Sequence, residues 1–96
     1  MFEFDLSDEL RIKLSKLAKK DKKRAEIINK KIKEIINRDK ETIQHYKNLR
    51  HDLSEYKRVH IDEHFVLAFK IFLSKNFVFF VDFDHHDRIY KNLERK

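Results

Sequence analysis

The stretch NFVFFVDFDHHDRIYK, residues 76–91, decides how this chain folds. It begins as a dense run of aromatic and β-branched side chains, which pack well on a pleated sheet and predict a strand over residues 77–83. A polar segment follows, with His85, His86, Asp87, Arg88 and Tyr90. These groups suit proton transfer or anion binding, and a strand that ends in them holds them at the edge of a sheet. We expect the rest of the chain to support this cluster.

Two further strand-like runs precede this stretch, over residues 56–61 and 65–72. The links between the three runs are short, so neighbouring strands must be antiparallel and form a three-stranded meander. The first run alternates, which places Arg58 and His60 on one face and their apolar neighbours on the other. We expect that Arg58 face to be open.

The N-terminal half predicts a short strand followed by a helical hairpin. Residues 2–6 alternate apolar and acidic side chains, and Ser7 then provides an N-cap. Apolar stripes at helical spacing mark two helices, with Leu10, Leu14, Leu17 and Ala18 in the first and Ala25, Ile28, Ile32, Ile35 and Ile36 in the second. Asp21 can cap the second helix. The predicted fold is therefore α+β, with the helices packed on one face of the sheet.

Composition limits the class of protein. A chain of 96 residues predicts a single domain over residues 1–96. The absence of Cys excludes a disulfide framework, and the absence of Gly excludes a phosphate-binding loop of the NTPase type. The sequence contains no run of eighteen apolar residues, so it predicts no membrane span. Its acidic start is unlike a signal peptide. We expect a cytoplasmic protein with no cofactor.

The net charge of +6 is concentrated in the first half of the chain. Residues 7–50 carry 15 Lys and Arg against 7 Asp and Glu, whereas residues 51–96 carry eight of each. A basic face of this kind steers association with a polyanion such as RNA, and a solvated Lys-rich helix face gives the same pattern.

Three stretches of the second half resemble the RelE/ParE toxin superfamily, in particular its RelE and YafQ-type ribonuclease branch. LRHDLSEYKRVHID (49–62) is similar to the leucine-containing loop and basic second strand of that family, and HFVLAFKI (64–71) looks like its third strand. DHHDRIY (84–90) resembles the family ending in which His and Arg, or a lone His, precede an aromatic residue. The helices match in pattern only.

This resemblance implies a toxin of a type II toxin–antitoxin pair, with a RelB-like antitoxin that lies over the toxin and blocks its site. Toxins of the RelE-like branch cut messenger RNA, typically in the ribosomal A site and without a metal. The residues at the matching positions are His60, His86, Arg58, Tyr90, His51 and Lys57. His60 and His86 are the candidate base and acid, in either order, because an unperturbed imidazole populates both forms near neutral pH. The cations would clamp the scissile phosphate, and Tyr90 would stack on a base or orient the 2′-OH.

Other interpretations remain open at this point. A ParE-like toxin would bind gyrase without hydrolysis, and a catalytically weak toxin would act mainly in a complex with its antitoxin as a co-repressor. Many RelE-like proteins carry Arg where this chain has Val66, and Asp82, Asp84 and Asp87 add negative charge near the predicted site. The same acids with His85 and His86 form a rival metal-site hypothesis, which alternation along a strand disfavours. We predict no metal.

Overall fold

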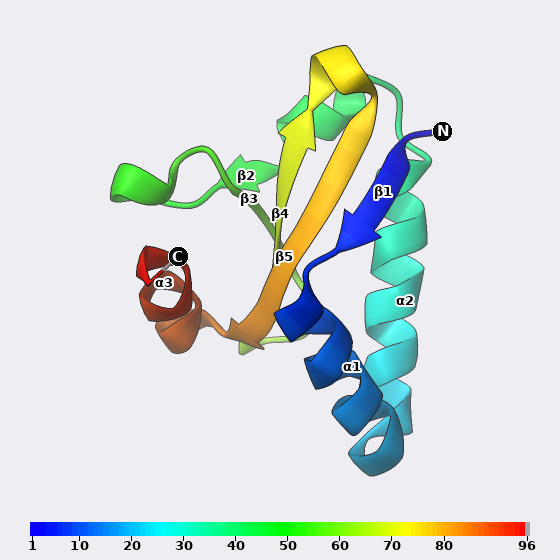
Figure 1. The fold of residues 1–96 in the computed structure, drawn as a ribbon, viewed down its shortest axis with the longest axis vertical. Coiled ribbons are helices and arrows are strands. Elements are labelled where there is room, and N and C mark those ends of the chain that lie inside the picture. The colour runs from blue at the N-terminus through cyan, green and yellow to red at the C-terminus, as the bar shows by residue number, and fades with distance from the viewer. Residues whose placement is uncertain (96) are drawn as a thin grey trace.

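A computed structural model describes residues 1–95, so Lys96 of the predicted domain lies outside the described residues. The chain forms one mixed sheet of five strands with helices on both faces (Figure 1). The strands are β1 (Glu3–Leu6), β2 (Lys47–Asn48), β3 (Lys57–His60), β4 (Phe65–Phe72) and β5 (Phe77–His85). The helices are α1 (Asp8–Lys20), α2 (Lys22–Ile36) and α3 (His86–Glu94), and the 3-10 turns are η1 (Thr42–His45), η2 (His51–Leu53) and η3 (Leu73–Lys75). The α+β prediction is confirmed.

The predicted meander forms the middle of the sheet, whose strand order is β1-β5-β4-β3-β2. β3, β4 and β5 pair antiparallel, as the short links require, and β1 adds to β5 in parallel. The turn at Asn76 uses the left-handed region, with φ of 52°. Asp62 builds the other turn, because its side chain accepts hydrogen bonds from the backbone N–H groups of His64 and Phe65. Asx turns of this kind replace the missing glycines.

The start of the helical hairpin is fastened to an irregularity in β5. The register between β4 and β5 shifts so that Phe80 pairs with Phe69 and Asp82 with Ala68, which leaves Val81 as an extra residue. Ser7 donates its hydroxyl proton to the Val81 carbonyl, 2.5 Å away, and accepts a bond from the N–H of Leu10 as the N-cap of α1. The bulge therefore fixes where α1 leaves the sheet.

The two faces of the sheet bury separate apolar clusters. The α1–α2 hairpin covers one face, where Ile28 and Ile35 of α2 pack on Phe69 and Phe80 of the sheet. Asp21 caps α2 as predicted, and the whole predicted stripe of α2 is buried. In α1 only Leu10 is fully buried, Leu14 and Leu17 are partly buried, and Ala18 is exposed, so the predicted stripe was too wide.

Helix α3 is the main departure from the predicted fold. The sequence predicts a polar strand end after residue 83 and an open second face, but residues 86–94 form a helix that covers part of that face. Ile89 and Leu93 lie one turn apart and pack on Val66 and Val81 of the sheet. Two apolar positions among polar residues are too few to mark a helix by periodicity alone.

A buried carboxylate joins α1, β5 and α3. Asp82 is fully buried, and it accepts hydrogen bonds from Lys13 Nζ at 2.7 Å and from Asn92 Nδ2 at 3.0 Å. The neighbouring Asp84 accepts from the same two groups at 3.4 Å and 2.8 Å. Burial raises the pKa of Asp84, but the hydrogen bonds from Asn92, from the N–H of His85 and from Lys13 outweigh it, so the net pKa is lowered.

We expect Asp84→Asn to destabilise the fold at neutral pH and to matter little in strong acid. A carboxyl with a lowered folded-state pKa adds stability above its unfolded pKa, and this stability is lost as the pH falls through the lowered value. Urea unfolding should show the variant less stable than the parent by about 1 kcal/mol at pH 7. That difference should shrink towards zero near pH 2, while the exposed Asp52→Asn control changes little. An equal loss at both pH values would contradict the assigned role of Asp84.

Candidate functional site

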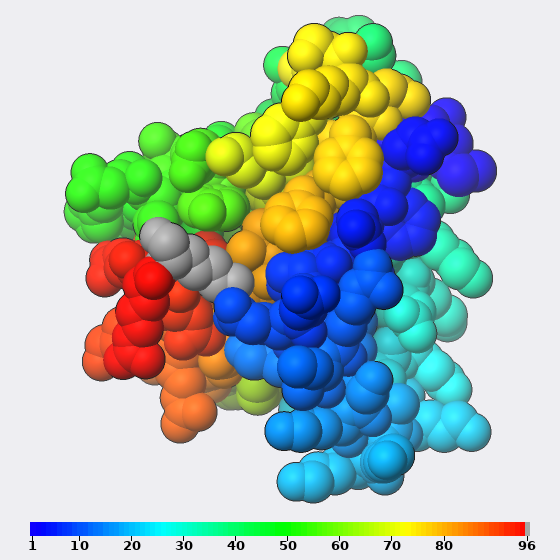
Figure 2. Space-filling view, viewed as in Figure 1, coloured from blue at the N-terminus to red at the C-terminus, as the bar shows by residue number. Residues whose placement is uncertain are grey.

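An open pocket of about 560 Å³ lies between η2, β3 and the first turns of α3. Its lining residues are Leu49, Arg50, His51, Arg58, His60, Glu63, Val66, His86, Asp87, Ile89 and Tyr90. Figure 2 shows the two walls side by side, with the segment around η2 in green and α3 in red. Five of the six residues predicted from the sequence line this pocket, although they come from three separate segments.

The sheet supplies the floor of the pocket. Arg58 and His60 point to this face of β3, as the alternation predicts, and His60 pairs across to Val66 of β4. Val66 is buried and lines the pocket, so its side chain is part of the floor. A floor with one small apolar residue leaves room above it for a ligand.

Helix α3 brings the C-terminal residues to the opposite wall. Its first residue is His86, and the carboxylate Oδ1 of Asp87 lies 3.0 Å from His86 Nδ1. The hydroxyl of Tyr90 accepts a hydrogen bond from the N–H of Arg50 at 3.3 Å, which ties α3 to the loop before η2. Besides lining the pocket, as predicted, Tyr90 makes this contact with the loop, which the sequence does not reveal.

His51 lies at the rim of the pocket in a strained backbone conformation. Its φ is 60°, in the left-handed region that only a few per cent of non-Gly residues adopt, His among the more frequent of them. Such a conformation costs on the order of 1–3 kcal/mol and persists where the surroundings enforce it, often at functional sites. Here Leu49 and Leu53 on either side of His51 are buried against the α3 face, and this packing holds the turn.

Lys57 does not reach the pocket. Its ammonium group points to the other side of β3, where it donates to the carbonyl oxygens of Gln44 and Tyr46 and to Asn48 Oδ1, at 2.8–3.0 Å. Burial lowers the pKa of Lys57. The predicted phosphate clamp at Lys57 is therefore corrected, because alternation along β3 turns its side chain away from Arg58. Its place is the support of the η1–β2 segment.

The structure supplies a second pocket cation that the sequence analysis missed. Arg50 lines the pocket and is exposed, and its position beside His51 in the matching loop was the available signal. Of the three acids predicted to oppose RNA binding, only Asp87 lines the pocket, where Glu63 joins it. Asp82 and Asp84 lie outside it, bonded to Lys13, so their charge is compensated elsewhere.

Comparisons with known proteins place the chain among toxins. It is 50% identical over 91 residues to a candidate toxin named RelE4 from Methanocaldococcus jannaschii, an alignment that covers 95% of this chain and 93% of the relative. The chain belongs to the RelE toxin family. It is also 47% identical over 90 residues to an uncharacterized protein of Methanosarcina mazei, covering 94% of this chain and all of that protein. No family model matches the sequence.

The RelE-like fold is confirmed by solved structures. YafQ from Escherichia coli superposes with a TM-score of 0.70 at 17% identity, covering 94% of this chain and 99% of YafQ. A metal-bound toxin from Helicobacter pylori superposes with a TM-score of 0.71 at 18% identity, covering 93% and 99% of the two chains. As a RelE-family protein, the chain is a toxin of a toxin–antitoxin system, and toxins of this family pair with an antitoxin.

We expect Tyr90→Phe to loosen the pocket wall without unfolding this RelE-family toxin. The variant loses the hydroxyl that accepts the N–H of Arg50, and a single hydrogen bond of this kind contributes about 1 kcal/mol, which corresponds to roughly fivefold faster exchange. Amide hydrogen exchange followed by NMR should show that acceleration at Arg50. Tyr56→Phe is the matched control, because Tyr56 packs against the same apolar cluster. Unchanged exchange at Arg50 would show that the contact does not order the loop.

Proposed function

We propose that this toxin cuts messenger RNA in the ribosomal A site, by attack of a 2′-OH on the adjacent phosphate and without a metal in the chemical step. The observation that carries the proposal is the pocket, which gathers three imidazoles and two guanidinium groups around an open volume. A volume of about 560 Å³ is in the range that holds a small ligand such as a nucleotide.

Arg58 and Arg50 are assigned to the scissile phosphate. Both are cations at any physiological pH, and a guanidinium can bind a phosphate with two parallel hydrogen bonds. They approach from different elements, because Arg58 stands on β3 and Arg50 precedes η2. Two cations on one phosphate stabilise the additional negative charge of the phosphorane that forms when the 2′-OH attacks.

His60 and His86 are assigned to proton transfer. Cleavage through the 2′-OH needs one group to remove the hydroxyl proton and another to protonate the 5′-oxygen that leaves. The two imidazoles stand on different elements that border the same pocket, β3 and α3, and both are exposed to solvent. Asp87 orients His86 through its Nδ1, which leaves the other ring nitrogen for the substrate. The order of acid and base stays open.

Tyr90 and His51 complete the pocket as supporting residues. The ring of Tyr90 is half-buried in the α3 cluster and its hydroxyl holds the Arg50 loop, so it can stack on a base while keeping the cation in place. His51 stands at the rim on η2, where an imidazole can contact the next phosphate.

The partners that follow from this proposal are RNA and a RelB-like antitoxin in the cytoplasm. The tip of the helical hairpin presents exposed lysines to a polyanion, among them Lys19, Lys20, Lys22 and Lys23. This surface would contact ribosomal RNA, while the antitoxin would cover the pocket. Within residues 1–95 no helix is long and apolar enough to cross a membrane.

The test is expression of the toxin alone in a translating extract, with primer extension on the messenger RNA. Replacing both His60 and His86 by Ala should lower the cleavage rate at least 100-fold, the usual contribution of general acid–base groups. His45→Ala is the matched control, since His45 is an exposed histidine on η1 that does not line the pocket. Circular dichroism should show that all variants are folded.

Two results would overturn the nuclease assignment. Cleavage that continues unchanged in the double variant would reject His60 and His86 as the proton-transfer pair. Intact messenger RNA together with inhibited DNA supercoiling would favour the gyrase-binding function instead.

A further inference from the structure

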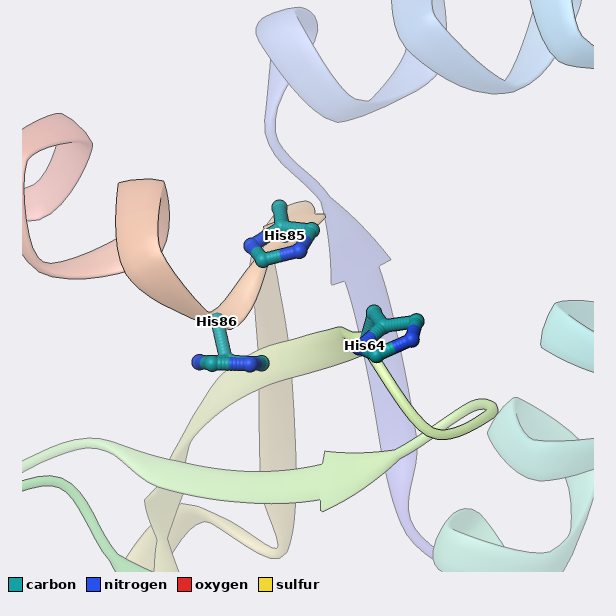
Figure 3. Close-up of side chains that lie close together, drawn as sticks. All are labelled: His64, His85 and His86. Carbon is teal, nitrogen blue, oxygen red and sulfur yellow. The ribbon is translucent and has the colours of Figure 1, made fainter.

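Three histidines meet beside the pocket, at the end of the central strands. One ring nitrogen from each of His64, His85 and His86 lies within 4.8 Å of the others. The ring centroids of His85 and His86 are 4.6 Å apart, and that of His64 is 5.7 Å and 6.3 Å from them. Figure 3 shows the three rings gathered where the turn before β4 meets the junction of β5 and α3. We propose that they bind one divalent transition-metal ion such as Zn²⁺.

The backbone holds the three residues in this arrangement. The N–H of His86 donates to the His64 carbonyl at 2.8 Å, so the two segments are bonded to each other at the cluster. Phe65 pairs with His85 in the sheet register, and the Asp62 side chain fixes the turn by accepting from the N–H of His64. The site therefore combines the end of β5, the first residue of α3 and a turn that is hydrogen-bonded to both sides, which favours a defined geometry.

Three imidazoles form a suitable ligand set for zinc. Neutral imidazole nitrogens bind Zn²⁺, Cu²⁺ and Ni²⁺, and three of them with one open position make a known type of zinc site. Tetrahedral coordination with Zn–N distances near 2.0–2.1 Å brings neighbouring nitrogens to roughly 3.4 Å. The observed separations of up to 4.8 Å close through small side-chain rotations, for which the 63% exposed side chain of His64 has room.

Carboxylates stand beside the rings, as in sites where a carboxylate orients a metal-binding histidine. Asp87 lies 3.0 Å from His86 Nδ1 and 3.5 Å from His85 Nδ1, and Glu63 lies 3.8 Å from His64 Nε2. In such pairs the nitrogen next to the carboxylate carries the proton and the other nitrogen binds the metal. His85 Nδ1 also accepts the N–H of Asp87 as the N-cap of α3. For Nε2 of His85 to bind a metal, the ring proton must move to Nδ1. Nδ1 then donates to the Asp87 carboxylate and no longer caps the helix.

If the proposed nuclease function holds, a metal ion in this site inhibits cleavage. His86 lines the cleavage pocket and also belongs to the histidine cluster. A ring nitrogen that donates its lone pair to a metal cannot accept or deliver a proton. Occupation of the cluster therefore withdraws His86 from proton transfer, and the metal acts as an inhibitor of cleavage.

The binding experiment is calorimetric titration of the full chain, stripped by a chelator and dialysed, with ZnCl₂. We expect one Zn²⁺ per chain at micromolar or tighter affinity and no comparable binding of Mg²⁺, which prefers oxygen ligands. His64→Ala and His85→Ala should each weaken Zn²⁺ binding at least tenfold, and His45→Ala should leave it unchanged. Because His85→Ala also removes a helix cap, His64→Ala is the decisive variant. Absence of Zn²⁺ binding, or equal affinity in His64→Ala, would overturn the site.

The inhibition is tested separately by primer extension with and without Zn²⁺. Zn²⁺ should suppress cleavage by the parent chain at least tenfold, and a zinc chelator that spares Mg²⁺ should restore it. His64→Ala should cleave at the parent rate and resist Zn²⁺, which controls for effects of zinc on the extract. If the parent binds Zn²⁺ but cleaves equally well with it, the inhibitory role is wrong. If the parent binds Zn²⁺ but never cleaves, the nuclease proposal fails while the metal site stands.

Discussion

The antiparallel pairing of β4 with β5 is the constraint on which the rest of this structure depends. The two strands run side by side from the Phe72–Phe77 pair to the Phe65–His85 pair, and both faces of the pair are buried. β5 also receives β1 in parallel, and its bulge at Val81 receives the N-cap of α1. The helices pack on this pair, β1 and β3 bond directly to it, and β2 joins the sheet only through β3.

Burial on both faces explains why a chain of this size can hold a fixed pocket. The hairpin of α1 and α2 covers one face of the sheet, and the side chains buried between them form the larger apolar cluster. On the other face α3 and the η2 loop cover part of β4 and β5, and the Tyr90 hydroxyl joins them. The uncovered part between them is the pocket. Lys13, Asp82 and Asn92 fix α3 against β5 from the far side, so the wall that carries His86 has a rigid support.

His86 stands at the boundary between two arrangements of polar groups. On one side it faces the pocket with His60 and the two arginines, and on the other it meets His85 and His64. Its position at the first residue of α3, directly after the last residue of β5, creates this double membership. At a junction between a strand and a helix, successive side chains point in different directions. The turn that Asp62 fixes before β4 brings His64 next to His85 and His86. The same residue thus belongs to both the proposed catalytic pair and the proposed metal site.

The sequence by itself determined the strands β3, β4 and β5, the capped hairpin at Ser7 and Asp21, and the common face of Arg58 and His60. These features depend on local periodicity and on capping chemistry, which are present in the amino-acid order. Only the tertiary structure decided that residues 86–94 form a helix, that β1 joins β5, and that Arg50 rather than Lys57 enters the pocket. It also brought His64 to His85 and His86. These outcomes depend on contacts between residues far apart in the chain, and such contacts leave no periodic signal in a single sequence.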